Sequence, residues 1–148
     1  MKSLIWMLVS LGLVAMAAGA DAPKSSPEGQ ARLEAAKAKK GLKVRGDCWR
    51  GEISGEKGRA VRLQLFKGLT YELYLAAGAG EKGKGTKMHI GVMNRESELV
   101  AKAVGKGHVA KLVFSPEATG TYMVLLRAEL TSGDAKRAVP CALVMGYR

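Results

Sequence analysis

The stretch FSPEATGTYMVLL, residues 114–126, decides the fold of this chain because it joins two strand patterns through a turn. Pro116 has no amide hydrogen to give to a β-ladder, so it ends the strand before it. Gly120 permits a tight return of the backbone. Tyr122 then begins an apolar run, and a period of two places its ring on the same face as Val124. We therefore expect a strand, a turn and a second strand that closes a core with an aromatic side chain.

The same period of two recurs on both sides of this stretch. Apolar and polar side chains alternate in residues 60–66, AVRLQLF, and a Lys-Gly pair follows as a turn. Residues 70–77, TYELYLAA, and 87–94, KMHIGVMN, repeat the alternation. The other segments with strand patterns are 42–53, 98–104, 108–114, 121–130 and 138–147. Seven or eight short strands separated by turns indicate an antiparallel β-sandwich or barrel.

The first twenty residues have the composition of a signal peptide for export. Lys2 supplies a positive charge, an apolar run follows, and the sequence AGA at 18–20 fits a cleavage site. The apolar run is shorter than the roughly 20 residues that a membrane span requires. We predict a signal peptide at 1–20, a polar tail and short basic helix at 21–41, and a β-sandwich domain at 42–148. The exported chain would be periplasmic or secreted.

Residues 26–41 carry the end signals of that helix. Ser26 is a good N-cap, Pro27 suits the first helical position, and Gly41 can end the helix in a left-handed conformation. The apolar side of the helix is thin and rich in alanine, so we expect only a weak contact with the domain.

The chain has two cysteines, and export favours a disulfide between them. The one possible pairing, Cys48 with Cys141, would join the first and last strands across 93 residues. Chain-entropy treatments value such a constraint at roughly 4 to 5 kcal/mol. The alternatives are a reactive thiol and half of a metal site, although the sequence has no C-x-x-C spacing.

The predicted mature chain is strongly basic. Without the first 20 residues it keeps 23 Lys and Arg against 13 Asp and Glu, a net charge of +10 over 128 residues. A positive field of this size attracts anionic partners. Aromatic residues are only 5% of the sequence, too few for the stacking platforms of nucleic-acid binding. We therefore predict anionic cell-wall polymer, lipid head groups or an acidic envelope protein as the partner.

The predicted binding residues are lysines near the helix and in a glycine-rich loop: Lys39, Lys40, Lys43, Lys82, Lys84 and Lys87. The alternative is that this charge serves solubility alone.

No catalytic or metal-binding pattern is present in the sequence. His89 and His108 lack a G-x-S-x-G, H-E-x-x-H or paired Cys/His context, and Asp47 and Asp134 are far apart in the chain. We expect His89 on a solvated strand face and His108 in a turn. The prediction is a protein without enzymatic activity, metal or cofactor. The alternative is a small hydrolase that uses one of the histidines.

Four segments together resemble the bacterial pre-peptidase C-terminal domain: FKGLTYELYLAAG, HIGVMNRESELVA, LVFSPEATGTYMVLL and CALVMGY. The positions that fill the motifs of this family are Gly68, Tyr71, Leu73, Leu75, Val92, Leu99, Val100, Pro116, Gly120, Tyr122 and Val124. The resemblance covers residues 52–147. It implies an exported, jelly-roll-like β-sandwich that accompanies a secreted enzyme, binding a matrix or wall polymer or aiding maturation.

This chain departs from that family in two ways. Relatives often carry aspartates at the start of the central strand, where some bind calcium, but this chain has Thr86, Lys87 and His89 there. We therefore expect no calcium site. No peptidase precedes the domain in this sequence, so we expect a stand-alone copy.

Several apolar residues fall on faces that the alternation assigns to solvent: Met93, Val100, Val109, Val113, Met123 and Leu125. If several are neighbours, they form a patch that marks a partner surface or a docking site for the helix. The other interpretation is that these strands are buried on both faces. The predicted function is an exported, non-enzymatic binding or accessory module with a basic face. The alternative is an interaction protein that docks another envelope protein through an apolar strand face.

Overall fold

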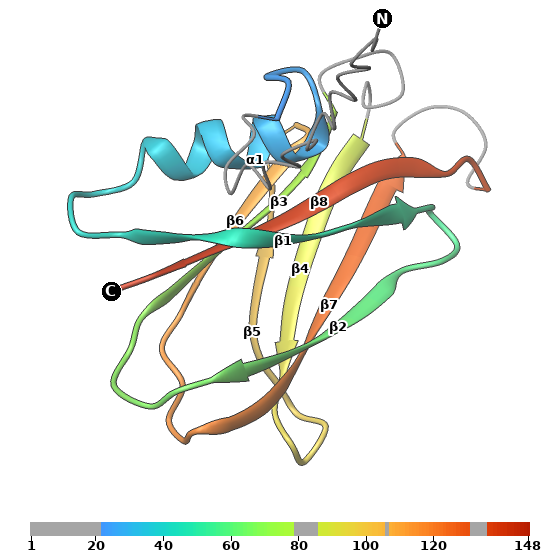
Figure 1. The fold of residues 1–148 in the computed structure, drawn as a ribbon. Helices are drawn as coiled ribbons and strands as arrows, with labels where there is room; N and C mark the ends of the chain where they lie inside the picture. The colour runs from blue at the N-terminus through green and yellow to red at the C-terminus, as the bar shows by residue number, and fades with distance from the viewer. Residues whose placement is uncertain (1–21, 79–85, 106, 131–135) are drawn as a thin grey trace, which may run out of the picture.

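The computed structural model describes residues 22–78, 86–105, 107–130 and 136–148, within which one helix precedes eight strands (Figure 1). The helix α1 spans Pro27–Ala36. The strands are β1 (Lys43–Ile53), β2 (Arg59–Leu65), β3 (Tyr71–Ala77), β4 (Thr86–Met93), β5 (Leu99–Val104), β6 (Val109–Phe114), β7 (Gly120–Leu130) and β8 (Val139–Tyr147). Each predicted strand segment overlaps one of these strands, with bounds that differ by at most one residue. The predicted signal peptide lies outside the described residues.

The strands form two antiparallel sheets that pack face to face. Sheet A has the order β1-β8-β3-β6, and sheet B has the order β2-β7-β4-β5. The chain crosses to the other sheet after almost every strand, and only β4 and β5 are consecutive strands of the same sheet. This is the arrangement of a jelly roll. The predicted all-β sandwich is therefore confirmed.

The turn between β6 and β7 has the structure that its residues predict. β6 ends at Phe114, Pro116 follows, and β7 begins at Gly120. The Tyr122 ring packs edge-on against Phe114, with the ring centroids 5.4 Å apart. The Tyr122 hydroxyl also donates a hydrogen bond of 2.7 Å to the carbonyl oxygen of Ala118. This bond ties the turn to the strand that follows it, a role for the hydroxyl that periodicity alone does not predict.

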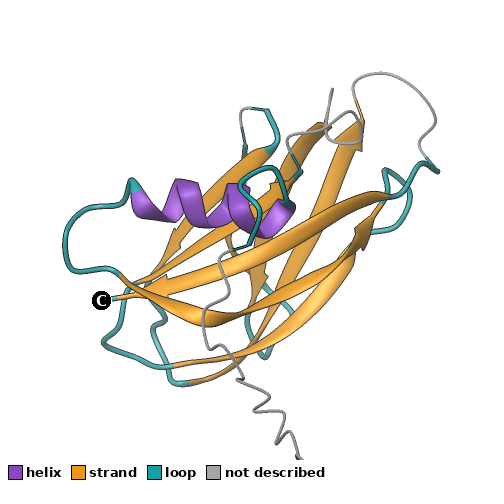
Figure 2. Cartoon of the chain, turned by 45° about the horizontal axis from the view of Figure 1, so that its top comes forward, coloured by secondary structure: helices purple, strands orange, loops and turns teal. Residues whose placement is uncertain are grey.

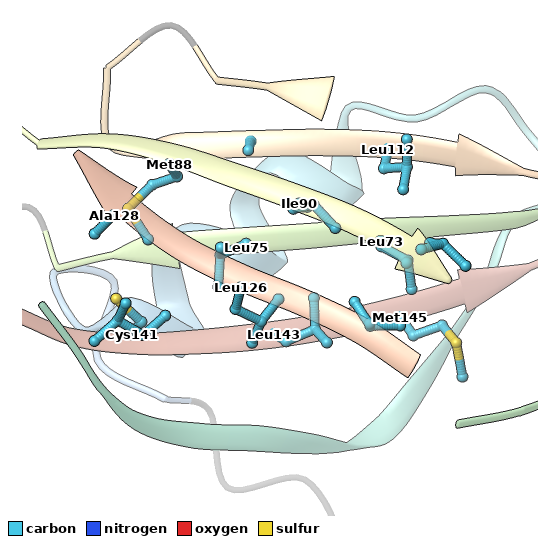
Figure 3. Packing of buried hydrophobic residues seen from close by; sticks show 14 of the residues in the cluster. Leu73, Leu75, Met88, Ile90, Leu112, Leu126, Ala128, Cys141, Leu143 and Met145 are labelled. Atoms are coloured by element: carbon cyan, nitrogen blue, oxygen red, sulfur yellow. The ribbon is translucent and has the colours of Figure 1, made fainter. Parts of the chain in front are cut away.

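The hydrophobic core fills the space between the two sheets (Figure 3). The inward side chains predicted from the alternation are buried there: Tyr71, Leu73, Leu75, Met88, Ile90, Val92, Tyr122, Val124 and Leu126. Full burial of one aliphatic side chain contributes about 1.5–3 kcal/mol. The alternation therefore identifies the side chains that hold the sandwich together.

Strand β3 is buried on both faces. Its outward residues Glu72, Tyr74 and Ala76 are as buried as its inward ones. The helix α1 lies across the outer face of sheet A (Figure 2), where Ala31 and Ala35 pack against Tyr74 and Ala76. Alanine side chains allow the helix to approach the sheet closely.

Polar contacts also attach α1 to β1. Arg32 donates hydrogen bonds of 3.0 and 2.7 Å to the carbonyl oxygens of Arg45 and Gly46. The Glu28 carboxylate accepts hydrogen bonds from Arg32 at 2.9 Å and from Arg50 at 2.8 Å. The bond from Arg50 is the main reason why the pKa of Glu28 is below its ordinary value. The helix is thus attached more firmly than its thin apolar side predicts.

The helix begins where predicted but ends earlier. The Ser26 hydroxyl caps it by accepting a hydrogen bond of 3.0 Å from the amide of Gly29. At the other end, the Lys37 amide donates to the carbonyl oxygen of Glu34 at 3.1 Å, which tightens the last turn. Gly41, with a φ of +102°, instead makes the turn that leads into β1.

The predicted disulfide between Cys48 and Cys141 is not formed, and both thiols are free. Cys141 pairs with Gly51, three residues from Cys48 along β1. The two Cα atoms are therefore about 10 Å apart, whereas a disulfide needs roughly 7 Å or less. Cys141 lies in the core (Figure 3), and Cys48 packs against the side chains beneath α1 on the other face of sheet A. Strand register and facing exclude this bond.

Candidate binding surfaces

Three of the predicted binding lysines lie close together. Lys39 and Lys40 lie in the turn between α1 and β1, and Lys43 begins β1. All three are exposed, and none has an ion pair with a residue that the structure describes. We call these three residues the lysine end. Lys82 and Lys84 lie outside the described residues.

The remaining predicted lysine, Lys87, lies elsewhere. It is an exposed residue near the start of β4, opposite Glu129 of β7. The lysine end is near the start of β3, because Lys43 and Tyr71 both pair with Tyr147. β4 starts beyond the other end of β3 (Figure 1). The length of β3 is about 20 Å, so Lys87 does not belong to the lysine end.

The outer face of sheet B has an apolar centre. Met93 of β4 pairs with Met123 of β7, and Gly91 pairs with Leu125 on the same face. Leu99 of β5, which is 55% exposed, lies over Gly91, where an added Cβ would be 3.0 Å from the leucine Cδ1 atom. The absence of a side chain at Gly91 therefore makes room for this leucine. We call Met93, Leu99, Met123 and Leu125 the sheet B patch.

Basic side chains flank the sheet B patch on the same face: Arg62 of β2, Lys102 of β5 and Arg127 of β7. All three are exposed, and no carboxylate in the described part of the chain forms an ion pair with them. Glu129 lies on this face too, but it bonds His89, with 3.1 Å between Oε2 and Nε2. We call Arg62, Lys102 and Arg127 the basic rim.

The apolar residues that the alternation assigns to outer faces have different surroundings. Met93, Met123 and Leu125 belong to the sheet B patch, whereas Val109 packs against the side chains beneath α1. Val100 and Val113 are exposed, at 42% and 50%. The helix therefore covers Val109 on sheet A, whereas three of these residues form an open patch on sheet B.

A cavity of about 660 Å³ lies beside the start of α1. Pro23, Pro27 and Pro140 contribute to its lining, together with Glu28 and Arg50. Glu28 and Arg50 form an ion pair with each other, so these two charges are already balanced within the protein. The cavity is therefore a weaker candidate for a binding site than the two basic surfaces.

The histidines and Asp47 form separate local contacts rather than a catalytic group. His108 Nε2 lies 2.8 Å from Oε1 of Gln30, which connects the loop before β6 to α1. Asp47 accepts hydrogen bonds from Arg45, and these lower its pKa. Asp134 lies outside the described residues. Among the residues that are described, no group of three His, Cys, Asp or Glu is placed to hold a metal ion.

Comparison with known proteins identifies a shared fold. No protein-family model matches the chain, and no curated protein matches it. A periplasmic inhibitor of g-type lysozyme from Aeromonas hydrophila is a similar solved structure, with 18% identity, a TM-score of 0.50 and coverage of 76% of this chain and 92% of that chain. Another is the pre-peptidase C-terminal domain of a collagenase from Bacillus anthracis, with 13% identity, a TM-score of 0.49 and coverage of 67% and 87%.

At these identities the likeness is one of fold. The chain has the two-sheet sandwich that its resemblance to the pre-peptidase C-terminal domain implied. The helix α1 is not long and apolar enough to cross a membrane.

The sequence indicates the apolar part of the sheet B surface but not its basic rim. The run TYMVLL in β7 is apolar on both faces, and this pattern indicates that Met123 and Leu125 place apolar surface on the outer face of the sheet. The basic rim has no such signal, because Arg62, Lys102 and Arg127 come from three strands that are distant in the chain. Only the strand order places them on one face.

Proposed function

We propose that this chain is an exported binding or accessory module of the cell envelope or extracellular space, which binds an anionic partner and catalyses no reaction. The observation that carries the proposal is exposed positive charge without ionic partners. The lysine end and the basic rim both lack carboxylate partners in the described part of the structure, and the predicted mature chain carries a net charge of +10. Such fields attract anionic partners and accelerate their association.

Export is supported by the first twenty residues, which have the order of charge, apolar run and small residues found in signal peptides. Their removal would leave a tail and helix at 21–41 and a β-sandwich domain at 42–148. A protein of similar fold is a periplasmic inhibitor of an enzyme. The fold is thus compatible with binding another protein in that compartment.

Two classes of anionic partner fit different surfaces. An anionic cell-wall polymer or lipid head groups would bind the lysine end, with Lys82, Lys84 and Lys87 as further predicted contacts. An acidic envelope protein is the second candidate, and the sheet B patch favours it because a polymer would leave that apolar surface in water.

The proposal is tested by binding of residues 21–148 to anionic wall polymer, to vesicles of anionic lipid and to proteins of an envelope extract. Raising the ionic strength from about 0.01 to 1 M shortens the Debye length from about 30 to 3 Å. We expect binding to weaken at least tenfold over this range. A triple Gln variant of the lysine end, Lys39→Gln with Lys40→Gln and Lys43→Gln, reports whether those residues take part. Absence of binding to all three at low salt would contradict the proposed function.

A further inference from the structure

We propose that the outer face of sheet B is the docking site for a partner protein whose contact surface has apolar side chains surrounded by carboxylates. The inference rests on the proposed binding function and names the surface and the kind of partner. It is carried by two features of one sheet face: the sheet B patch and the basic rim.

The two sheets differ in how their outer faces are covered. α1 packs against strands of sheet A, and Tyr74 and Val144 beneath it are fully buried. No described element lies in that way over sheet B, and Leu99 remains 55% exposed there. Exposed apolar side chains that are neighbours mark an interaction site more often than isolated ones do. The open face is therefore on sheet B.

The composition of this face suits a protein partner. Two of the four patch residues are methionines, Met93 and Met123, whose flexible side chains adapt to the shape of a partner. Leu99 lies over Gly91 and so adds apolar surface at the centre of the sheet. Protein interfaces combine an apolar centre, in which methionine and arginine are enriched, with a polar rim. This face has the same organisation.

The basic rim defines the charge of the partner. Arg62, Lys102 and Arg127 have no ionic partner in the described part of the chain. Carboxylates of a docked protein would therefore be the first ionic partners of these side chains. Two copies of this chain joined through the same face would bring like charges together, which disfavours self-association. An anionic polymer would satisfy the rim but leave the apolar centre exposed. The surface as a whole thus fits an acidic protein with an apolar centre.

Site-specific photo-crosslinking tests where the partner binds. A photoreactive phenylalanine analogue is placed at Leu99 or Met123 in the full chain, and at Leu33 as a control. Leu33 is a suitable control because it is 41% exposed on α1. In an envelope extract we expect the same protein adduct from positions 99 and 123 and none from position 33. Mass spectrometry then identifies the adduct and the residues joined.

Charge reversal tests the chemistry of docking with the identified partner. Arg62→Glu with Lys102→Glu changes the rim. The control, Lys24→Glu with Lys37→Glu, changes the net charge by the same amount at two exposed residues that flank α1, which covers sheet A. We expect the rim variant to bind at least about tenfold more weakly, because like charges would then face the carboxylates of the partner, and the control variant to change affinity by less than about threefold.

Each outcome decides the proposal. Equal weakening in both charge variants, adducts from position 33 alone, or adducts that join two copies of this chain would overturn the docking site. These outcomes leave the proposed anionic binding intact, since that function is measured separately by its salt dependence. A wild-type chain that binds no anionic component at low salt would contradict both.

Discussion

The negative charge of Glu28 helps to attach α1 to strand β1. The residue is 8% exposed, and its carboxylate accepts hydrogen bonds from Arg32 and Arg50. The bond from Arg50 is the main cause of its lowered pKa, and burial opposes it. Because the folded-state pKa is lowered, ionised Glu28 stabilises the protein above its ordinary pKa of 4.5 and loses that contribution as the pH falls through the lowered value.

We predict that Glu28→Gln lowers the free energy of unfolding at pH 7 by about 1 kcal/mol, since a charge-assisted hydrogen bond is lost while solvent screens the exposed side of Arg50. The difference from wild type should shrink as the pH is lowered below 4.5. Urea unfolding, followed by the fluorescence of Trp49, measures both quantities. Glu34→Gln is the matched control, because Glu34 bonds the exposed Lys37 and we expect a change within about 0.5 kcal/mol. A pH-independent difference would contradict this assignment.

The two cysteines should both titrate as thiols. Burial raises the pKa of Cys141 to about 12, and burial followed by the nearby Glu28 carboxylate raises the pKa of Cys48. We expect a thiol reagent at pH 8 to leave Cys141 unmodified in the folded protein and to modify Cys48 slowly, because the thiolate is the reactive form. After denaturation without reductant, two thiols should react, and one in Cys48→Ser. A count of zero in the denatured wild type would show that the disulfide forms after all.

At the scale of elements, α1 changes strand β3 from a half-exposed strand into one that is buried on both faces. Ala31 is fully buried against the sheet, whereas Ala36 on the same helix is exposed. The small side chain at position 31 therefore sets the distance between the helix and sheet A.

We predict that Ala31→Leu lowers the free energy of unfolding by about 1–3 kcal/mol, because the larger side chain does not fit between the helix and the sheet. Ala36→Leu should change it by less than about 0.5 kcal/mol, since that position faces solvent. Chemical denaturation of the two variants gives the comparison. Equal effects would mean that the helix does not pack on sheet A as described.

In the whole molecule, α1 covers the outer face of sheet A, whereas the outer face of sheet B is open to solvent. β3 has a neighbouring strand on each side and is buried on both faces, whereas β2 pairs only with β7. We predict that amide hydrogens of β3 exchange only through global unfolding and that those of β2 exchange at least about tenfold faster. Hydrogen exchange followed by mass spectrometry or NMR measures this difference. Similar protection of the two strands would contradict the described strand order.

The strands, the turn at Pro116 and the inward core residues follow from the sequence alone. Alternation of apolar and polar residues depends on neighbours two positions apart, and proline and glycine act on their own backbone, so these signals are local. The N-cap at Ser26 is local in the same sense. For that reason the all-β sandwich could be predicted without any knowledge of strand pairing.

Only the tertiary structure decided which outer face is covered and which residues meet there. A run such as TYMVLL is apolar on both faces, and nothing local shows that α1 covers sheet A and leaves Met123 on sheet B open. The disulfide prediction was wrong for the same reason: the register of β1 with β8 places Cys48 and Cys141 on opposite faces. Register and strand order arise from contacts between distant segments, so periodicity within a segment does not contain them.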